Sequence, residues 1–437
     1  MAIPLILASK SKARQGVLFH AGVRPTIRVS HVDEAAVVVK AASKRGVNPD
    51  DLTVQERVPL LAQAKAQAVY REYQAIMQTA KQAHGELHIS RPLTDDFGTI
   101  AEIMPIEQAI ASHQGLSQAS AGPLIIGCDS MFELDGVPYG KPHTEEHARE
   151  RLRLMRGRTG VLWTGHCVID VASGRMVSRA SHAKVTFCNF SDQMIDRYIA
   201  TGEPLEVAGS FTLDGFGGAF IDGIEGDPSG IIGLSLPLAR ELVEELGVDW
   251  TDLWNIDRDE QQGVKADPNA PKDNVNQPGD GFIDCVCGHK HWGLNGASGV
   301  LLCRRDASDG RITHVLMQHR ALWSAEGGKW GIPGGATADG ESPLEGALRE
   351  SFEEANIHPE DIDVVGSYKE DHGPWSYTTV FAFEKPGHSV EPRANDDESL
   401  EIEWVPVEQV GSLNLLAAMQ TDWPRFEHRL HQLSQQW

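Results

Sequence analysis

The stretch that most constrains this chain is Gly335–Ile357, which follows the glycine-rich segment Gly331-Ile-Pro-Gly-Gly335. Glycine can adopt a positive φ and lets a backbone approach a ligand closely, so we expect a loop there. Ser342 and Glu345 then form a capping box around Pro343, and proline suits the first helical position. The stretch therefore predicts a glycine-rich loop followed directly by a helix.

The predicted helix has one apolar face and one acidic face. Glu350, Glu353 and Glu354 stand three and four residues apart, so their side chains share a face. Like charges at this spacing repel each other, whereas Mg²⁺ or Mn²⁺ prefers carboxylate oxygens as ligands. The residues alone leave two interpretations open, a solvated acidic face and a site for a divalent metal ion. The buried stripe on the other face would consist of Leu344, Ala347, Leu348 and Phe352.

The stretch resembles the Nudix box, Gly-x5-Glu-x7-Arg-Glu-U-x-Glu-Glu-x-Gly-U, in which U is an aliphatic residue. Two positions depart from it. Asn356 replaces the last glycine, a mild change because Asn also suits a left-handed helix end, and Ser351 brings a hydroxyl to an apolar position, where we expect looser packing. The resemblance implies a Nudix α/β/α sandwich with Glu350, Glu353 and Glu354 as metal ligands, the last two also catalytic. The positions in register are Gly335, Glu341, Arg349, Glu350, Glu353, Glu354 and Ile357.

The whole chain has 437 residues, which is too long for one ordinary core and predicts two domains. A net charge of −23 argues against stable binding to nucleic acid or to an anionic membrane. No apolar run approaches the roughly 20 residues that span a bilayer, and the N-terminus reads as a strand rather than a signal peptide. The six cysteines are mostly scattered, which fits reduced thiols and a cytoplasmic protein. A homodimer is left open.

The N-terminus contains a candidate phosphate site. An apolar run, Pro4–Ala8, predicts a buried strand, and Gln15–Ala21 predicts a helix. Between them stand Ser9, Ser11 and Arg14, so hydroxyls, a guanidinium and free backbone N–H groups would converge. An ordinary strand–helix turn is the alternative.

Further along, the sequence predicts alternating strands and helices with glycine-rich turns. We expect a second strand to close at His31–Glu34 and another, Pro123–Cys128, to end at Asp129-Ser130, whereas Ile224–Asp227 reads as a turn. The mixed, polar residues 81–122 read as an insertion or lid. Further predicted elements are the helices Leu60–Thr79, which carries Lys65, Glu145–Met155 and Leu236–Leu246, and the strands Gly160–Ile169 and Ser181–Phe187.

Residues 3 to about 250 resemble the Maf family of nucleoside triphosphate pyrophosphatases, with an interruption at 81–122. The resemblance implies a Maf/ITPase-like, two-lobed, mixed-sheet α/β domain. It also implies hydrolysis of a nucleoside triphosphate to the monophosphate and pyrophosphate, with a divalent metal ion. The ordered marks are Leu7-Ala8-Ser9-x-Ser11-x-x-Arg14, Asp33-Glu34, Lys65, Asp129-Ser130, Gly140-Lys141-Pro142, Gly202-Glu203-Pro204, Ala208-Gly209 and Ile224-Glu225-Gly226-Asp227 with Gly233-Leu234.

The family pattern assigns roles to residues of this first half. Asp129 matches the aspartate taken as general base, and Glu34 matches an acidic residue of the site. Cations that face phosphates in the family match Arg14, Lys65 and Lys141. Of these, Lys141 is also a candidate catalytic residue. Lysine and arginine suit this task because attack on phosphorus must overcome the negative charge of the phosphate chain. Further substrate-binding candidates are Ser9, Ser11, Ala13, Ser130 and Asp214.

Three of these positions bear on the preferred base. Family members that act on dTTP and UTP carry arginine at the position of Ala13, threonine at Ser130 and glutamine at Asp214, and this sequence departs at all three. An ionised carboxylate only accepts hydrogen bonds, so Asp214 suits the two donors on the edge of guanine. We therefore expect guanine-type triphosphates, including 7-methyl-GTP, to be at least as good substrates as UTP or dTTP. The alternative is that Asp214 only caps a turn.

The composition changes at 254–284, where polar residues, Pro and Gly indicate a linker between domains at 1–253 and 285–437. In Cys285-x-Cys287-x-His289-x-His291, alternate side chains on one strand would share a face and approach a zinc ion. A plain leading strand with reduced thiols is the alternative. Further predicted strands are Ala297–Arg304, Thr313–His319, Ile362–Tyr368, Trp375–Phe383 and Leu400–Val405, and the predicted helices are Leu413–Met419 and Trp423–Leu433.

Together these features predict a cytoplasmic, bifunctional nucleotide hydrolase whose partners are nucleotide substrates. A second hypothesis is that one module only binds nucleotide and regulates the other. A third, an RNA-decapping or RNA-processing factor, needs a basic track for the strand, and the acidic net charge argues against it.

Overall fold

The computed structural model describes residues 2–86, 93–94, 100–101, 123–256, 278–285, 290–324, 326–372, 375–395 and 398–434. Backbone contacts divide the chain into two compact units. Unit 1 consists of Met1–Glu72 and Ala119–Val264, and unit 2 of Tyr73–Gln118 and Lys265–Trp437. Among the described residues, no helix has the length and apolar character needed to cross a membrane.

Unit 1 is built on a mixed sheet with the strand order β2-β1-β5-β7-β8-β9, and β6 pairs with β5. β1 is parallel to both β2 and β5, and the remaining pairs are antiparallel. The strands are β1 (Leu5–Leu7), β2 (Thr26–Ile27), β5 (Leu124–Leu134), β6 (Val137–Tyr139), β7 (Thr159–Asp170), β8 (Met176–Phe187) and β9 (Ile221–Gly226). The helices are α1 (Lys12–His20), α2 (Glu34–Arg45), α3 (Val54–Glu86, shared with unit 2), α5 (Glu145–Met155), α6 (Asp192–Ile199), α7 (Pro228–Ile232) and α8 (Leu236–Glu245).

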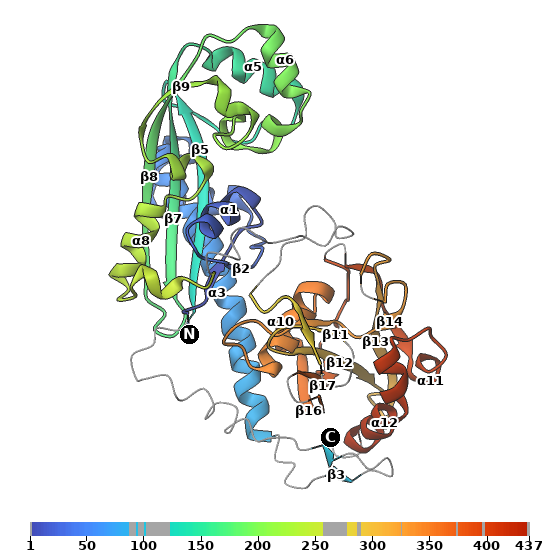
Figure 1. Ribbon diagram of the computed structural model, residues 1–437. Helices are drawn as coiled ribbons and strands as arrows, with labels where there is room; N and C mark the ends of the chain where they lie inside the picture. The colour runs from blue at the N-terminus through green and yellow to red at the C-terminus, as the bar shows by residue number, and fades with distance from the viewer. Residues whose placement is uncertain are drawn as a thin grey trace. The chain divides into compact units, whose positions relative to one another are not determined.

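Two separate hydrophobic cores give unit 1 two lobes. One core joins α1, α8 and the start of β5, through Leu18, Leu242 and Leu124. The other joins the end of β5 with α5, through Phe132 and Leu152. Figure 1 shows α1, α3 and α8 around one end of the long strands and α5 and α6 at the other. The predicted two-lobed, mixed-sheet α/β fold is confirmed.

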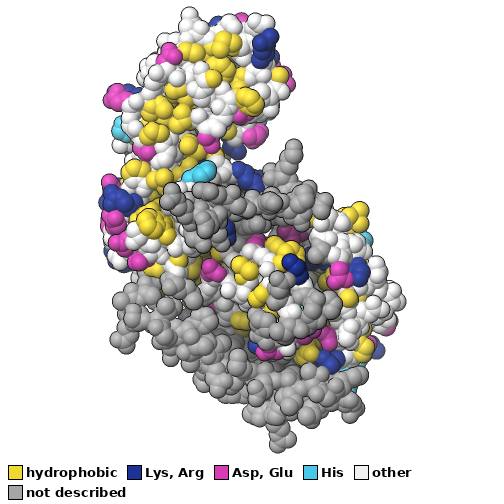
Figure 2. All heavy atoms as spheres, in the orientation of Figure 1, with side chains coloured by type: hydrophobic (Ala, Val, Ile, Leu, Met, Phe, Trp, Pro, Cys, Tyr) yellow, Lys and Arg dark blue, Asp and Glu magenta, His cyan; other side chains and the backbone are white. Residues whose placement is uncertain are grey.

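The charged surface of the second lobe is made largely of ion pairs. Arg149 of α5 contacts Asp196 of α6 at 2.9 Å, and Arg153 contacts Asp192 at the same distance. On the face shown in Figure 2, basic, acidic and hydrophobic side chains of this lobe are interspersed. These pairs therefore tie α5 to α6 at the surface, above the core that the two helices share.

Helix α3 lies very close to the sheet at two glycines. A Cβ atom at Gly127 of β5 would lie 2.4 Å from the carbonyl oxygen of Ala62, and one at Gly165 of β7 would lie 2.1 Å from that of Val58. Only a residue without a side chain fits such gaps. The two glycines therefore set the distance at which α3 presents its side chains to the middle of the sheet.

Several predicted boundaries in unit 1 were wrong. α3 starts at Val54 and continues to Glu86, into the predicted insertion. β5 does not end at Asp129-Ser130 but runs on to Leu134, because its pairing with β7 continues along both strands. Asp33 does not close a strand; its side chain caps α2 by accepting the amide of Ala36. Ile224–Asp227 is not a turn, since β9 extends through Gly226.

Unit 2 has a second mixed sheet with the order β14-β13-β12-β17-β16, with β15 on β12 and β18 on β13. β12 and β17 are parallel, and the other pairs are antiparallel. The strands are β12 (Ala297–Arg305), β13 (Ile312–Arg320), β14 (Trp330–Gly331), β15 (Gly334–Ala336), β16 (Ile362–Asp371), β17 (Ser376–Glu384) and β18 (Ser399–Pro406), and the helices are α10 (Pro343–Ala355), α11 (Val407–Val410) and α12 (Ala417–Ser434). Outside this sheet, β10 (Phe282–Asp284) pairs with β11 (Lys290–Trp292), and β3 (Leu93–Thr94) pairs with β4 (Ile100–Ala101).

Alternate residues of β12 face opposite layers of unit 2. Val300 and Leu302 pack in one core with Leu348 of α10. Leu301 and Cys303 pack in the other core, which includes Trp423, Phe426 and Leu430 of α12. Successive strand side chains point to opposite faces, so one sheet separates the two helices. The predicted α/β/α sandwich is confirmed.

The last part of α3 belongs to unit 2 by its packing. Ile76 and Ala80 are buried in the same core as Ile357 and Ile362. The hydroxyl of Thr79 donates to the carbonyl oxygen of Pro359 at 3.2 Å. The helix segment after Tyr73 therefore covers apolar side chains around the end of α10.

Two predictions in unit 2 were wrong. Phe352 is only half-buried, and Ser351 is fully buried instead, because its hydroxyl donates to the carbonyl oxygen of Ala347 at 2.7 Å and needs no other polar partner. Residues 413–416 are not helical: Leu415 forms a β-bridge with Trp330, and α12 begins only at Ala417. The capping box of Ser342 and Glu345 is confirmed, as is the left-handed Asn356, with φ of 58°.

Candidate active sites

The centre of unit 1 is an ion cluster from three elements. Asp129 of β5 is 7% exposed, and its Oδ1 lies 2.6 Å from Nζ of Lys65 on α3. The same Nζ lies 2.8 Å from Oε1 of Glu34, the first residue of α2. One ammonium group thus connects two carboxylates that are far apart in sequence. The close approach of α3 at Gly127 and Gly165 makes this possible, since Gly165 is the partner of Asp129 across β5 and β7.

The environment of Asp129 changes its acidity. Burial raises the pKa of this carboxyl above its ordinary value of 3.8, and Lys65 and Arg14 lower it without cancelling that effect. A carboxylate with a raised pKa is a stronger proton acceptor than a solvated one. Asp129 therefore combines the position and the basicity that a general base needs.

Arg14 gathers the hydroxyl groups that the sequence placed around it. Its guanidinium donates to Oγ of Ser9 at 3.0 Å, to Oγ of Ser130 at 3.2 Å and to the carbonyl oxygen of Gly233 at 2.9 Å. Ser11 caps α1 by accepting the amide of Arg14. Four predicted substrate-binding residues, Ser9, Ser11, Arg14 and Ser130, thus lie together, with Ala13 in the first turn of α1.

Sequence reasoning missed two buried residues behind this group. Thr164 is 1% exposed; its hydroxyl lies 3.0 Å from that of Ser130 and donates to the carbonyl oxygen of Gly230. His166 is fully buried, and its Nε2 accepts the amide of Ser235 at 2.8 Å, while burial lowers its pKa to about 3. The only sequence signal was their alternation within an otherwise apolar strand.

Lys141 and Asp214 lie in the lobe built on the second core, and neither belongs to the cluster around Asp129. Lys141 is exposed and forms an ion pair with Glu206 at 3.6 Å. Asp214 is exposed on the bend before Phe216. The carboxylate that holds this bend is that of Glu203, which accepts the amides of Phe216 and Gly217 at 3.0 Å. Glu203 is thus a further structural residue that sequence reasoning had used only as a family mark.

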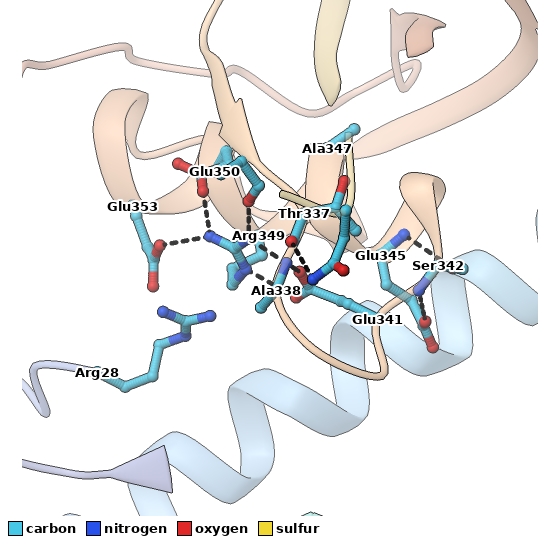
Figure 3. Close-up of polar contacts among 12 residues, drawn as sticks. Arg28, Thr337, Ala338, Glu341, Ser342, Glu345, Ala347, Arg349, Glu350 and Glu353 are labelled. Atoms are coloured by element: carbon cyan, nitrogen blue, oxygen red, sulfur yellow. Dashed lines mark hydrogen bonds and ion pairs between the residues drawn. The ribbon is translucent and has the colours of Figure 1, made fainter. Parts of the chain in front are cut away.

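The centre of unit 2 is the buried Arg349 of α10 (Figure 3). Its Nε and one terminal nitrogen donate to the two carboxylate oxygens of Glu341 at 2.7 and 2.8 Å, a bidentate contact across the loop. The other terminal nitrogen contacts Glu350 and, at 3.2 Å, Glu353. Burial alone would lower the pKa of Arg349, but Glu341 and Glu350 raise it well above its ordinary value. Arg349 therefore carries a permanent charge that holds the loop and the acidic helix face together.

Glu354 points to a different part of the loop. It is 4% exposed, and its Oε2 accepts the amide of Gly334 at 2.8 Å and the side-chain amide of Gln318 at 3.3 Å. Gln318 is completely buried and also donates to Oγ of Ser399 at 2.9 Å. Gln318 was missed because a single polar residue in a strand carries no local sequence signal.

The glycines of the loop serve close packing rather than a positive φ. Gly331, Gly334 and Gly335 do not have positive φ angles; the positive φ angles on either side of them are those of Gly328 and Gly340. A Cβ atom at Gly335 would lie 2.7 Å from the carboxylate of Glu350, and one at Gly334 would lie 2.5 Å from the carbonyl oxygen of Ser298. The expected reason for these glycines was therefore wrong in part: they are needed because α10 and β12 pack directly on the loop.

Both centres offer carboxylate oxygens, the donors that a hard divalent cation prefers. The space that Gly335 leaves open is filled by a carboxylate, and Glu350 and Glu353 share one nitrogen of Arg349, so their oxygens lie near each other. In unit 1, Glu34 and Asp129 share Nζ of Lys65. Oxygen donors of this kind suit Mg²⁺ or Mn²⁺.

The single strand from Cys285 to His291, which both interpretations assumed, was wrong. Cys285 follows β10, and His291 belongs to β11, the partner strand of a hairpin, so they do not alternate along one strand. Cys287 and His289 lie outside the described residues. The structure brings His372 to Cys285 and His291 instead.

Comparison with known proteins finds two families in separate parts of the chain. Residues 4–246 match the family of Maf-like proteins, and residues 294–427 match the NUDIX domain. A nucleoside triphosphate pyrophosphatase/Nudix hydrolase fusion protein of Bifidobacterium longum is 60% identical over 481 aligned positions, which cover 99% of both chains. A nucleoside triphosphate pyrophosphatase of Streptomyces coelicolor is 41% identical and covers 57% of this chain and 94% of its own.

Among solved structures, a Nudix hydrolase of M. smegmatis, RenU, is 34% identical and covers 35% of this chain and 94% of its own, with a TM-score of 0.29. The two family matches cover separate parts of the chain, and the Bifidobacterium longum relative matches it from end to end. The chain therefore belongs to the family of Maf-like proteins, in the form that carries a C-terminal Nudix domain.

Proposed function

We propose that this chain is a bifunctional nucleotide hydrolase. The Maf-like region, residues 1–253, hydrolyses nucleoside triphosphates to the monophosphate and pyrophosphate. The Nudix region, residues 285–437, hydrolyses a nucleoside diphosphate linked to another moiety, and 254–284 joins the two. The names of the two relatives support the first activity, and the one from Bifidobacterium longum supports both. The alternative of a purely regulatory module is not favoured, since the full-length relative from Bifidobacterium longum is named for a hydrolytic activity in each part.

The observation that carries the proposal is the cluster of Asp129, Lys65 and Glu34. Water that attacks the phosphate chain must be oriented and must lose a proton, which a basic, buried carboxylate such as Asp129 accomplishes. Cations nearby stabilise the negative charge that the phosphates carry. Lys65 supplies this charge at Asp129 and Arg14 supplies it at the neighbouring Ser130, with Ser9, Ser11 and Ser130 as hydroxyl donors.

In the Nudix region, Glu350, Glu353 and Glu354 would hold Mg²⁺ or Mn²⁺, and the ion would polarise the phosphate chain and orient the attacking water. The contribution of this chain is the framework that keeps these carboxylates in place. Arg349 anchors Glu350 and Glu353, and the amide of Gly334 anchors Glu354. Glu353 and Glu354 are also the proposed catalytic residues of this region.

The base preference remains a proposal that depends on Asp214. Because Glu203 already accepts the amides of the bend at Phe216, the carboxylate of Asp214 is not needed for that task. The exposed carboxylate of Asp214 supports recognition of a base that presents two hydrogen-bond donors. Lys141, on the same lobe, would approach the phosphates. Guanine-type triphosphates, including 7-methyl-GTP, are the proposed substrates of the Maf-like site.

The site of action proposed for this enzyme is the cytoplasm, which the scattered cysteines support. Nucleotides are its proposed partners, without stable binding to nucleic acid or to a membrane.

The test is an assay of the full-length protein with two readouts. Pyrophosphate release is measured from a panel of nucleoside triphosphates with Mg²⁺, and phosphate-bond cleavage is measured on a panel of nucleoside diphosphate derivatives. Asp129→Asn should lower the first activity by about 10²–10⁴-fold and leave the second unchanged, and Glu353→Gln should do the reverse. Each variant is the control for the other. Loss of both activities in either folded variant would contradict two independent sites.

A further inference from the structure

We propose that Cys285, His291 and His372 bind a zinc ion, at a site separate from both hydrolytic centres. One donor atom of each side chain lies within 4.8 Å of the other two. Cys285 follows β10, His291 lies in β11 and His372 follows β16, so three segments of unit 2 converge on one point. Among the described residues, this is the only gathering of three such donors.

The distances suit a tetrahedral ion. Zinc binds sulfur at about 2.3 Å and imidazole nitrogen at about 2.0–2.1 Å, so its ligand atoms stand about 3.3–3.6 Å apart. The three donor atoms lie within 4.8 Å of one another, so the widest pair allowed by this limit would have to approach by about 1.2–1.5 Å to share one ion. The sulfur of Cys285 lies 3.7 Å from the backbone oxygen of His372, so the thiol is next to the residue that carries this imidazole. Three protein ligands leave one position for water or a further donor.

The two histidine rings are held in place by groups around them. One ring nitrogen of His372, Nε2, lies 2.8 Å from Oε1 of Glu370. A carboxylate behind a histidine is the usual support of a zinc ligand, because it fixes the tautomer and raises the basicity of the ring. His291 stacks on Trp375 with centroids 4.0 Å apart, and Nε1 of Trp375 donates to the backbone oxygen of Trp292.

The donor set selects the class of metal. A thiolate with two imidazoles favours zinc, whereas the glutamates of α10 offer only oxygen and favour Mg²⁺ or Mn²⁺. The two sites would therefore hold different ions in one unit. The thiol of Cys285 is buried and not part of a disulfide, so it is available as a thiolate ligand.

The ion would stabilise a weak element beside the Nudix centre. β10 and β11 form a two-stranded sheet of their own, and such a hairpin is only marginally stable alone. Next to the hairpin, the side-chain amide of Asn295 donates to Asp339 at 2.8 Å and to the carbonyl oxygen of Thr337, in the loop that leads to α10. A zinc ion that ties the hairpin to His372 would therefore fix one wall of that loop.

The experiment uses the full-length protein, stripped of metal with a chelator and then titrated with Co²⁺ as a spectroscopic substitute for zinc. A thiolate ligand gives an intense charge-transfer absorption that carboxylate ligands do not produce, so the Nudix centre stays silent. We expect one cobalt ion with this absorption per chain. Cys285→Ser should abolish the absorption, His372→Ala should weaken cobalt binding strongly, and Glu370→Gln should weaken it by about 10–100-fold. Cys188→Ser, a half-buried thiol of unit 1, is the matched control and should bind cobalt like the wild type.

A second measurement does not depend on the folding of any variant. X-ray absorption at the zinc edge of the zinc-loaded wild type should show a sulfur neighbour together with imidazole nitrogens. A zinc shell of light atoms only, or a cobalt absorption that persists in Cys285→Ser, would overturn the site.

Discussion

In unit 1 the carboxylates of Glu34 and Asp129 meet at the single ammonium group of Lys65, whereas in unit 2 the carboxylates of Glu341, Glu350 and Glu353 surround Arg349. The first cluster joins two helices and a strand from distant parts of the chain. The second lies within one loop and one helix. A dispersed site depends on how the elements pack, and a local site depends mainly on its own sequence. The two clusters should therefore respond differently to mutation.

The largest effect should follow the loss of the cation of the local cluster. Arg349→Met leaves the buried Glu341, whose side chain is 5% exposed, without its charged partner. Removal of one member of a buried ion pair costs about 3–5 kcal/mol of unfolding free energy. Hydrogen exchange at the amides of β12 would measure this in unit 2.

Arg311→Met is the control for that change, because its side chain is 72% exposed and pairs only loosely with Asp309. Its expected effect is about 0–1 kcal/mol. Equal protection of β12 in both variants would show that Arg349 does not organise the Nudix centre.

The dispersed cluster should be sensitive to backbone spacing far from any charge. Gly165→Ala places a Cβ atom 2.1 Å from the backbone of α3, so the helix must move away from the sheet. We expect a loss of about 1–3 kcal/mol in unfolding free energy. Pyrophosphate release should fall as well, because Lys65 moves with α3.

Gly223→Ala in β9 is the matched control, since nothing lies within 4 Å of the added atom. Denaturant unfolding and pyrophosphate release would be measured for both glycine variants. Full activity in Gly165→Ala would mean that the position of α3 does not set the Lys65–Asp129 contact.

A smaller effect is expected from removal of the Lys65 charge, which lowers the pKa of Asp129. A general base must be deprotonated, so kcat/KM for pyrophosphate release falls as the pH drops through the pKa of Asp129. Lys65 lowers this pKa, and Lys65→Met should therefore move the acid limb of the profile to higher pH. Lys40→Met, an exposed residue of α2, should leave the limb in place.

The same shift has a defined sign for stability. Because the pKa of Asp129 is raised in the fold, its protonated form stabilises the native state below pH 3.8. That contribution is lost as the pH rises through the pKa in the folded protein. If the acid limb of the kcat/KM profile moved to lower pH in Lys65→Met, Lys65 would not be the group that lowers the pKa of Asp129.

The smallest effect concerns the base. Asp214→Asn replaces an acceptor-only group by one that both donates and accepts. A hydrogen bond to a charged group contributes about 1.5–3 kcal/mol, so an exposed one should change kcat/KM for GTP by about tenfold at most. The ratio of kcat/KM for GTP and UTP would be measured in the full-length protein. A clear preference for UTP and dTTP that Asp214→Asn leaves unchanged would reject the role in base recognition.

The sequence by itself was sufficient for the local centre. The capping box, the left-handed Asn356 and the acidic face of α10 depend on residues a few positions apart, and the backbone of a helix fixes their relation. The resemblance to the Maf and Nudix families, rather than periodicity, predicted the two-lobed unit and the sandwich. It also identified Ser9, Arg14 and Ser130, which the fold then gathered.

Only the tertiary structure decided the rest. The extension of β5 through Asp129, the burial of Thr164 and Gln318, and the meeting of His372 with Cys285 all depend on pairing between distant segments. Such contacts leave no periodic pattern, since each involves a single residue from each segment. The sequence indicated that the glycines of the Nudix loop matter, but the reason it gave, a positive φ, was partly wrong. Their close packing against Glu350 depends on how α10 lies on the loop, which the sequence does not show.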